Sequence, residues 1–334
     1  MSVVAAFRDG LQRVNRAPGI LAGVWILTLV AGLPLAAALR TSLADHLGQS
    51  LAADSAAAGA NYDWMQEFAD QASGIGLTFK PTVIGFGAIL DNLSAFIDDT
   101  ARPIAIVATA SLYVLAWIFL AGGIVDRFAR DRAIGAHGFF AACGVFFFRF
   151  LRLAIVQWLV YAFLFAYLHD WLFDTFYPRI THEMSVERTA FLTRLALYLV
   201  FGLLVAAAAL VFDYAKVRAV VEDRRSMLGA IGAALGFVRR NTAAAAGVFA
   251  ANFILFVVVV GVYALVAPGA GSAGPSMWVG FALGQLYVIG RLWVKLLFWA
   301  SETALFQRRL AHAGYVARPT PVWPDSPAAE ALRG

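Results

Sequence analysis

Residues 277–306 read MWVGFALGQLYVIGRLWVKLLFWASETALF, and this stretch decides the fold class. It is long enough to span a bilayer, which takes about 20 predominantly apolar residues, yet its second half contains Arg291 and Lys295. With Glu302 taken as the cytoplasmic edge of the span, Arg291 lies eleven residues inside it, which is about 16 Å along a helix and close to the midplane. A cation at that depth costs about 2.5 to 3.5 kcal/mol, so such groups are usually paired or face a cavity. The stretch therefore predicts a transmembrane helix with an unusual charged site.

The polar side chains of this stretch are the candidate binding residues. Gly280, Gly284, Arg291 and Lys295 fall on one helical face. Because a Gly-x-x-x-Gly pattern marks the close approach of two helices, we expect this charged face to pack inward. We predict ligand binding at Arg291, Lys295 and Gln285. The alternatives are that the two cations reach toward the inner headgroups and that Gln285 bonds a neighbouring helix.

The composition is that of a membrane protein. Hydrophobic residues make up 61% of the 334 residues and charged residues 14%, against about 45 to 50% and 25% in soluble domains. The basic residues are distributed between the apolar stretches and not gathered on one compact face, so the net charge of +5 does not indicate nucleic-acid binding. The single cysteine, Cys143, excludes an intramolecular disulfide and a cysteine metal site. No cofactor is predicted.

Six apolar stretches predict an all-α polytopic membrane protein built as three helical hairpins with interfacial helices on the cytoplasmic side. Residues 40–102 form a predicted extracytoplasmic helical insertion between the first two spans, and residues 169–194 a short outer loop. Residues 1–312 thus make up one membrane domain, and the proline-rich residues 313–334 a disordered cytoplasmic tail. The predicted spans are 20–39, 103–125, 135–169, 195–212, 242–266 and 277–306.

The orientation follows from the distribution of Lys and Arg. Of these 26 residues, 18 fall in the predicted inner segments and 6 in the outer ones. Cytoplasmic segments of membrane proteins carry such an excess of cations. We therefore expect both termini in the cytoplasm, with basic interfacial helices over residues 1–19 and 214–241.

A threefold pattern of charges accompanies the hairpins. The closing acids are 87 and 89 residues apart, which suggests an internal repeat. The alternative is that any span entering from a basic cytoplasm starts after an arginine. The pattern consists of an arginine before each outward span and an acid after each inward span: Arg16, Arg149 and Arg240, and Asp126, Asp213 and Glu302.

These six residues are predicted structural charge anchors. One hypothesis is that each acid faces the arginine of a neighbouring hairpin and locks the inner ends of the helices together. The simpler alternative is a local pair at the helix end, which stabilises a helix by about 0.2 to 0.5 kcal/mol. The local pairs would be Asp126 with Arg130, Asp213 with Lys216, and Glu302 with Arg308.

Two runs resemble a known group of proteins. They are LVFDYAKVRAVVEDRRSMLGAIGAALGFVRRN over residues 210–241 and GQLYVIGRLWVKLLFWASETALFQ over residues 284–307. The pattern of Asp-x-Ala-Lys followed by an acidic-basic helix is similar to that of uncharacterised bacterial six-span inner-membrane proteins. Some of these look like the membrane domain that precedes glycerophosphodiester phosphodiesterases. The resemblance implies a fold and a location in the bacterial inner membrane, but no hydrolase domain is present.

No sequence motif indicates a specific reaction. Residues 269–274 fit G-x-G-x-x-G but follow a membrane helix, whereas a dinucleotide site needs a preceding strand. No Gly-x-Ser-x-Gly elbow is present. The predicted outer loop holds several possible metal ligands without the His-Glu-x-x-His spacing, so we predict no metal. These are His169, Asp170, Asp174, His182, Glu183 and Glu187.

Three classes of function remain. We favour a non-enzymatic membrane component that binds anionic lipid headgroups at the cytoplasmic face, or membrane protein partners, because each interfacial arginine contributes about 1 kcal/mol toward anionic lipids. The second is a transporter or channel with Arg291 in the translocation path. The third is a lipid-modifying enzyme that uses outer-loop acids such as Asp170, Glu183 and Glu187.

Overall fold

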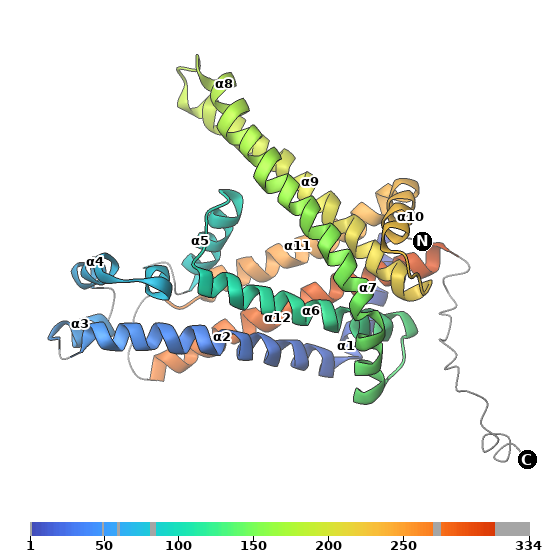
Figure 1. The fold of residues 1–334 in the computed structure, drawn as a ribbon, viewed down its shortest axis with the longest axis horizontal. Helices are drawn as coiled ribbons and strands as arrows, with labels where there is room; N and C mark the ends of the chain where they lie inside the picture. The colour runs from blue at the N-terminus through green and yellow to red at the C-terminus, as the bar shows by residue number, and fades with distance from the viewer. Residues whose placement is uncertain (1, 49, 59–60, 81–84, 270–274, 311–334) are drawn as a thin grey trace, which may run out of the picture.

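The protein is all-helical and has six helices long and apolar enough to cross a membrane (Figure 1). The computed structural model describes residues 2–48, 50–58, 61–80, 85–269 and 275–310, and this part of the chain contains no strand. The predicted fold class, a polytopic α-helical membrane protein, is confirmed. The six long elements are α2 (Pro18–Leu47), α6 (Ile104–Arg130), α7 (Ala136–Phe163) with its continuation to Thr181, α9 (Glu187–Val221), α11 (Thr242–Val266) and α12 (Pro275–Arg309).

Shorter helices cover both ends of the bundle. At the N-terminal end lie α1 (Val3–Asn15) and α10 (Met227–Arg240), and at the far end of α2 lies the insertion (Figure 1). The predicted inner helix over 214–241 is in fact two elements, because α9 continues to Val221 and α10 starts anew, with the Ser226 side chain accepting from the Gly229 N–H. The insertion contains α3 (Ala52–Ala58), α4 (Tyr62–Gln71), the 3-10 turn Gly74–Thr78 and α5 (Phe86–Ile97). The predicted tail, 313–334, and its boundary lie outside the described residues.

The third and fourth spans are longer than predicted. In place of an outer loop over 169–194, α7 continues through two π-helical segments, Leu164–His169 and Trp171–Phe176, into α8 (Tyr177–Thr181). Helix α9 then begins at Glu187. These residues are helical because Phe173 and its neighbours form an aromatic cluster that packs on Phe201 of α9. The hairpin formed by α7 with its continuation and α9 extends away from the other helices (Figure 1). Charged residues made this segment look like a loop, but its apolar residues bury one face.

The main hydrophobic core lies at one end of the molecule. Its main part is formed by α1, α10 and the C-terminal ends of three spans, residues 121–130, 210–221 and 292–306, which we call the basal layer, and α7 and α11 add residues such as Phe150 and Val248. Beyond it the spans expose large apolar side chains such as Leu203 and Leu286, as expected of surfaces that face lipid. The helices are therefore held together mainly at this end, where the N-terminus also lies (Figure 1).

Helix α1 docks on the basal layer through one face. The buried residues of α1 are Ala6, Gly10, Arg13 and Val14, at the three- and four-residue spacing of a single helical face. Glycine at position 10 lets the two backbones touch, because a Cβ there would lie 2.7 Å from the Ser301 Cα in α12. The α1–α12 contact thus depends on the absence of a side chain.

Arg13 closes this contact with hydrogen bonds to two other helices. Its Nη1 donates to the Phe128 carbonyl of α6 and to the Gln307 Oε1 of α12, each at 2.7 Å. Its Nε donates to Asp9 at 3.0 Å, and Asp9 also accepts from Arg308 of α12 at 2.8 Å. One buried guanidinium therefore joins the first helix to the ends of α6 and α12.

Candidate ligand-binding cavity

A cavity of about 750 Å³ lies next to the basal layer, between α6, α7, α9, α11 and α12. Its walls are largely aromatic, as in many pockets that bind small molecules. The tryptophans come from three helices and give the cavity rigid apolar walls. The aromatic lining residues include Tyr113 and Trp117 of α6, Trp158 and Tyr161 of α7, Phe249 and Phe256 of α11, and Phe298 and Trp299 of α12.

Four charged side chains line the same cavity. Arg291 and Lys295 stand one turn apart on α12, and Asp213 and Lys216 stand one turn apart on α9. The Lys216 Nζ lies 2.8 Å from Asp213, whose carboxylate also accepts from the Trp299 indole at 3.1 Å. The single carboxylate of the cavity is therefore already engaged by α9 and α12.

The two cations of α12 have no such partner. Among the described residues, Arg291 and Lys295 make no hydrogen bond or ion pair, and both are exposed to the cavity. The Lys295 Nζ lies 3.8 Å from the centroid of the Trp117 ring, a cation–π contact. Charges inside a membrane are usually paired. Three cations facing one carboxylate therefore leave an excess of positive charge that suits an anion.

The structure separates the predicted binding residues into two groups. Arg291 and Lys295 share the cavity, whereas Gln285 lies elsewhere and accepts from the Trp25 indole of α2 at 3.0 Å. Its position agrees with the alternative of a bond between helices. Sequence reasoning missed Lys216 as a cavity residue, because its spacing of three residues from Asp213 indicated only a local pair.

The charge anchors do not join in the way the repeat suggested. Arg16 pairs with Asp131 at 3.5 Å, Arg149 with Asp223 at 2.5 Å, and Arg240 donates to the Gly236 carbonyl at 3.1 Å. The hypothesis that these arginines face the closing acids is wrong, because each lies nearer a turn or its own helix. The simpler alternative holds for two of the acids: Asp126 with Arg130 and Asp213 with Lys216, both at 2.8 Å.

Glu302 is the exception among the closing acids. The predicted pair with Arg308 does not form, because α1 docks on α12 and Asp9 takes that arginine. Glu302 is 0% exposed, and neither of its carboxylate oxygens has a hydrogen-bond partner. The buried hydroxyl of Tyr214 in α9 also has none. The basal layer thus contains polar groups that are costly to bury.

These geometries predict opposite results at two acids. Asp213→Asn should lower the melting temperature in detergent by about 2 to 6 °C, because the acid accepts two hydrogen bonds worth about 1 to 2 kcal/mol in total. Glu302→Gln should leave the melting temperature unchanged or raise it, since it removes a carboxylate without a partner. A larger loss in Glu302→Gln than in Asp213→Asn would show that Glu302 does anchor the helices.

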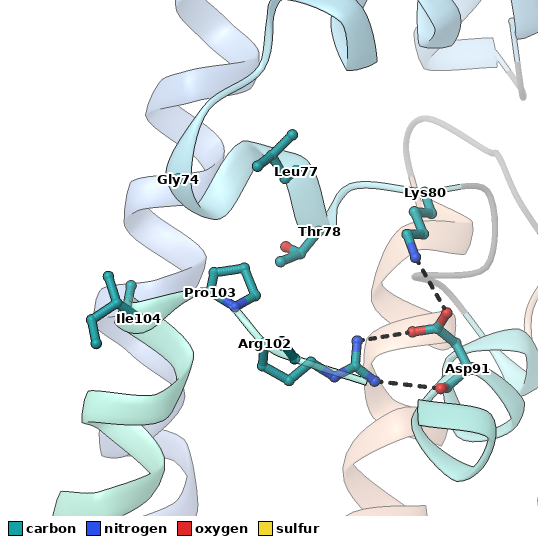
Figure 2. A pocket seen from close by; sticks show the side chains of 10 residues that line it. Gly74, Leu77, Thr78, Lys80, Asp91, Arg102, Pro103 and Ile104 are labelled. Atoms are coloured by element: carbon teal, nitrogen blue, oxygen red, sulfur yellow. Dashed lines mark hydrogen bonds and ion pairs between the residues drawn. The ribbon is translucent and has the colours of Figure 1, made fainter. Parts of the chain in front are cut away.

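A second pocket lies in the insertion and offers a weaker site. It has a volume of about 470 Å³ and lies between the 3-10 turn, α5 and the start of α6 (Figure 2). Figure 2 shows its two cations directed at one acid: Lys80 lies 3.7 Å and Arg102 3.4 Å from Asp91. Because both are partnered, this pocket lacks the unpaired cations of the central cavity.

The residues considered as outer metal ligands are spread along the α7–α9 hairpin. His169 is buried among aromatic rings, with its Nε2 2.6 Å from the Ile97 carbonyl of α5. Asp170 and Glu187 lie on exposed helical positions. His169 thus has a structural role, joining α5 to the hairpin.

Comparisons with known proteins found no matching family model, curated protein or solved structure. The chemistry of the central cavity is therefore the basis of the proposal below.

Proposed function

We propose that this integral membrane protein is a non-enzymatic component of the bacterial inner membrane that binds an anionic amphiphile, such as a lipid, in the central cavity. The observation that carries the proposal is that Arg291 and Lys295 line an aromatic cavity whose one carboxylate, Asp213, pairs with Lys216 and not with them. An anionic headgroup would supply the missing charge, and its hydrocarbon part would contact the tryptophan and phenylalanine walls.

The topology and location belong to the same proposal. The excess of cations at the basal end supports a cytoplasmic position for both termini and for α1 and α10. The resemblance of residues 210–241 and 284–307 to bacterial inner-membrane proteins supports the location. The arginines of α1 and α10 would then attract anionic headgroups of the inner leaflet.

Native mass spectrometry of the protein in a mild detergent tests the binding proposal. The wild type should retain an anionic lipid, and Arg291→Gln combined with Lys295→Gln should weaken its retention at least about tenfold, since a charge-assisted hydrogen bond contributes roughly 1.5 to 3 kcal/mol. Arg188→Gln is the matched control, because it removes an exposed cation at the start of α9 that neither lines the cavity nor belongs to α1 or α10. Equal retention by the double variant and the wild type would refute the proposal.

A transporter with Arg291 in its path is the second candidate. It is favoured by the position of the cavity along the spans and by the π-helical segments of the α7 continuation, since such segments often occur at functional sites. Flux of a labelled anion into liposomes separates the two functions. Binding without flux supports a binding component, and flux that is lost in Arg291→Gln supports transport.

A further inference from the structure

A separate pocket lies at the corner where α1 turns into α2. It has a volume of about 470 Å³ and also touches the end of α6 and the start of α7. We call it the corner pocket and define it by Arg16, Pro18, Gly19, Gly23, Arg127 and Phe139. Since α2 begins and α6 ends here, the pocket lies where two spans leave the apolar part of the bilayer.

Arg127 is a buried cation of this pocket without an acid to pair with. Its residue is 6% exposed, and its Nη2 donates to the Arg16 carbonyl at 3.3 Å. Its Nη1 is buried and has no hydrogen-bond partner. Among the described residues Arg127 forms no ion pair; the Asp131 charge acts on it from a distance, and that acid pairs with Arg16. A buried arginine with one weak acceptor needs a further acceptor, and an anion in the adjoining pocket would provide it.

The start of α2 opens into the same pocket. Ala17 precedes the helix and gives it no side-chain cap, and its first turn contains no acid. Gly19 and Gly23 stand one turn apart, and a Cβ at either position would meet no atom within 4 Å. The N–H groups at the start of a helix attract phosphate and other anions. The absence of side chains leaves that approach open.

The rest of the pocket is apolar. Ile20 and Val24 of α2, Leu120 of α6 and Phe140 of α7 line it. The charged end, formed by Arg16 and Arg127, is therefore continuous with a hydrocarbon-like wall. Asp131 adjoins the charged end, where it forms an ion pair with Arg16, whose side chain is 61% exposed, and its charge also acts on Arg127. Arg16 and Arg127 together carry two positive charges and Asp131 one negative charge, so a bound anion would balance the remaining positive charge.

We propose that the corner pocket binds the phosphate group of an anionic phospholipid, with the phosphate between Arg16, Arg127 and the first turn of α2. The acyl chains follow the apolar wall formed by α2, α6 and α7. This site is distinct from the central cavity and does not depend on its occupancy. The apolar wall favours a lipid over free phosphate.

The test uses glycines, because Arg127→Gln could fail to fold. Gly19→Asp places a negative charge where the phosphate would lie, and an acid in the first turn of a helix is otherwise favourable. Gly23→Leu fills the pocket. The matched controls are Gly229→Asp in the first turn of α10, where a Cβ would lie 3.3 Å from the Ser226 Oγ, and Gly32→Leu in α2, where a Cβ meets no atom within 4 Å.

Delipidated full-length protein is titrated with dioleoyl phosphatidylglycerol and followed by native mass spectrometry. Gly19→Asp and Gly23→Leu should each weaken the binding of one lipid about tenfold, whereas both controls should bind like the wild type. Dioleoyl phosphatidylcholine should bind more weakly, and inorganic phosphate should displace the lipid only at much higher concentration.

Three results would overturn the proposal: unchanged binding in both pocket variants, equal binding of phosphatidylcholine, or displacement by inorganic phosphate at the concentration of the lipid, which would indicate a site for free phosphate. The variant Arg291→Gln with Lys295→Gln, measured alongside, separates the two sites. If the double variant loses a bound lipid and Gly19→Asp does not, the result supports a site in the central cavity alone. If Gly19→Asp loses a bound lipid and the double variant does not, the result supports a site in the corner pocket alone.

Discussion

Replacing Gly10 with valine should lower the melting temperature of the protein in detergent by about 5 to 10 °C. A Cβ at this position would lie 2.7 Å from the Cα and 2.8 Å from the backbone nitrogen of Ser301. Neither backbone can move aside as a flexible side chain could, so α1 must shift away from α12. Forced overpacking of a core costs about 1 to 3 kcal/mol and sometimes more, which corresponds to a shift of this size.

Gly232→Val provides the control for the intrinsic effect of valine on a helix. Gly232 lies in α10, another short helix of the basal layer, and a Cβ there meets no atom within 4 Å. The melting temperature of the Gly232→Val variant should differ from that of the wild type by no more than about 3 °C. Equal melting of the two variants would mean that α1 does not dock on α12 through Gly10.

Arg13→Gln should be at least as destabilising, for an electrostatic reason. The Phe128 carbonyl and the Gln307 side chain lose a charged donor at 2.7 Å, and Asp9 loses one of its two arginines. Removing one partner of a buried charged network costs about 3 to 5 kcal/mol, so the melting temperature should fall by roughly 5 to 15 °C. Arg16→Gln is the matched control. Its side chain is mostly exposed and its ion pair is long, so the change should be under about 1 kcal/mol.

The same network predicts how stability depends on pH. Burial alone would raise the Asp9 pKa, but the hydrogen bonds and charges of Arg13 and Arg308 outweigh it and hold the pKa below 3.8. Because the folded-state pKa is lower than the unfolded one, the stabilising contribution of Asp9 is complete above pH 3.8 and is lost as the pH falls through the folded value. Melting curves recorded between about pH 2.5 and 7 should therefore show a smaller loss at acid pH for Asp9→Asn than for the wild type.

The six spans could be predicted from the sequence because each depends on local composition. Charge misled the prediction at the end of α9, which continues past Asp213 to Val221, and in the α7 continuation, where Phe173 and His169 are covered by α9. Arg291 and Lys295 could be singled out because a cation within an apolar stretch is visible without a structure, and both line the central cavity, while their role in binding stays a prediction. Their shared cavity with Lys216 was not predictable, because α9 and α12 come together only in the tertiary fold.

The clearest failure of sequence reasoning concerns Arg13 and Arg16. Both are basic residues of the same amphipathic segment, and the repeat pattern favoured Arg16 as the anchor. The structure buries Arg13 against α6 and α12 and leaves Arg16 mostly exposed. Helix α1 is oriented about its axis so that Gly10 faces α12, and Arg13 lies on that same buried face. This orientation is set by the contact with α12, which the sequence of α1 alone does not reveal.

The α1–α12 contact also sets the order in which the molecule can be completed. Arg13 and Gln307 are 294 residues apart in the chain, a separation that takes about 15 to 60 s to synthesise at roughly 5 to 20 residues per second. Throughout that time α1 lacks α12, the helix against which Gly10 packs, and can contact only elements made earlier, such as α6. Although α1 emerges from the ribosome early, its contact with α12 can form only after α12 has been inserted, so this contact is completed late in assembly.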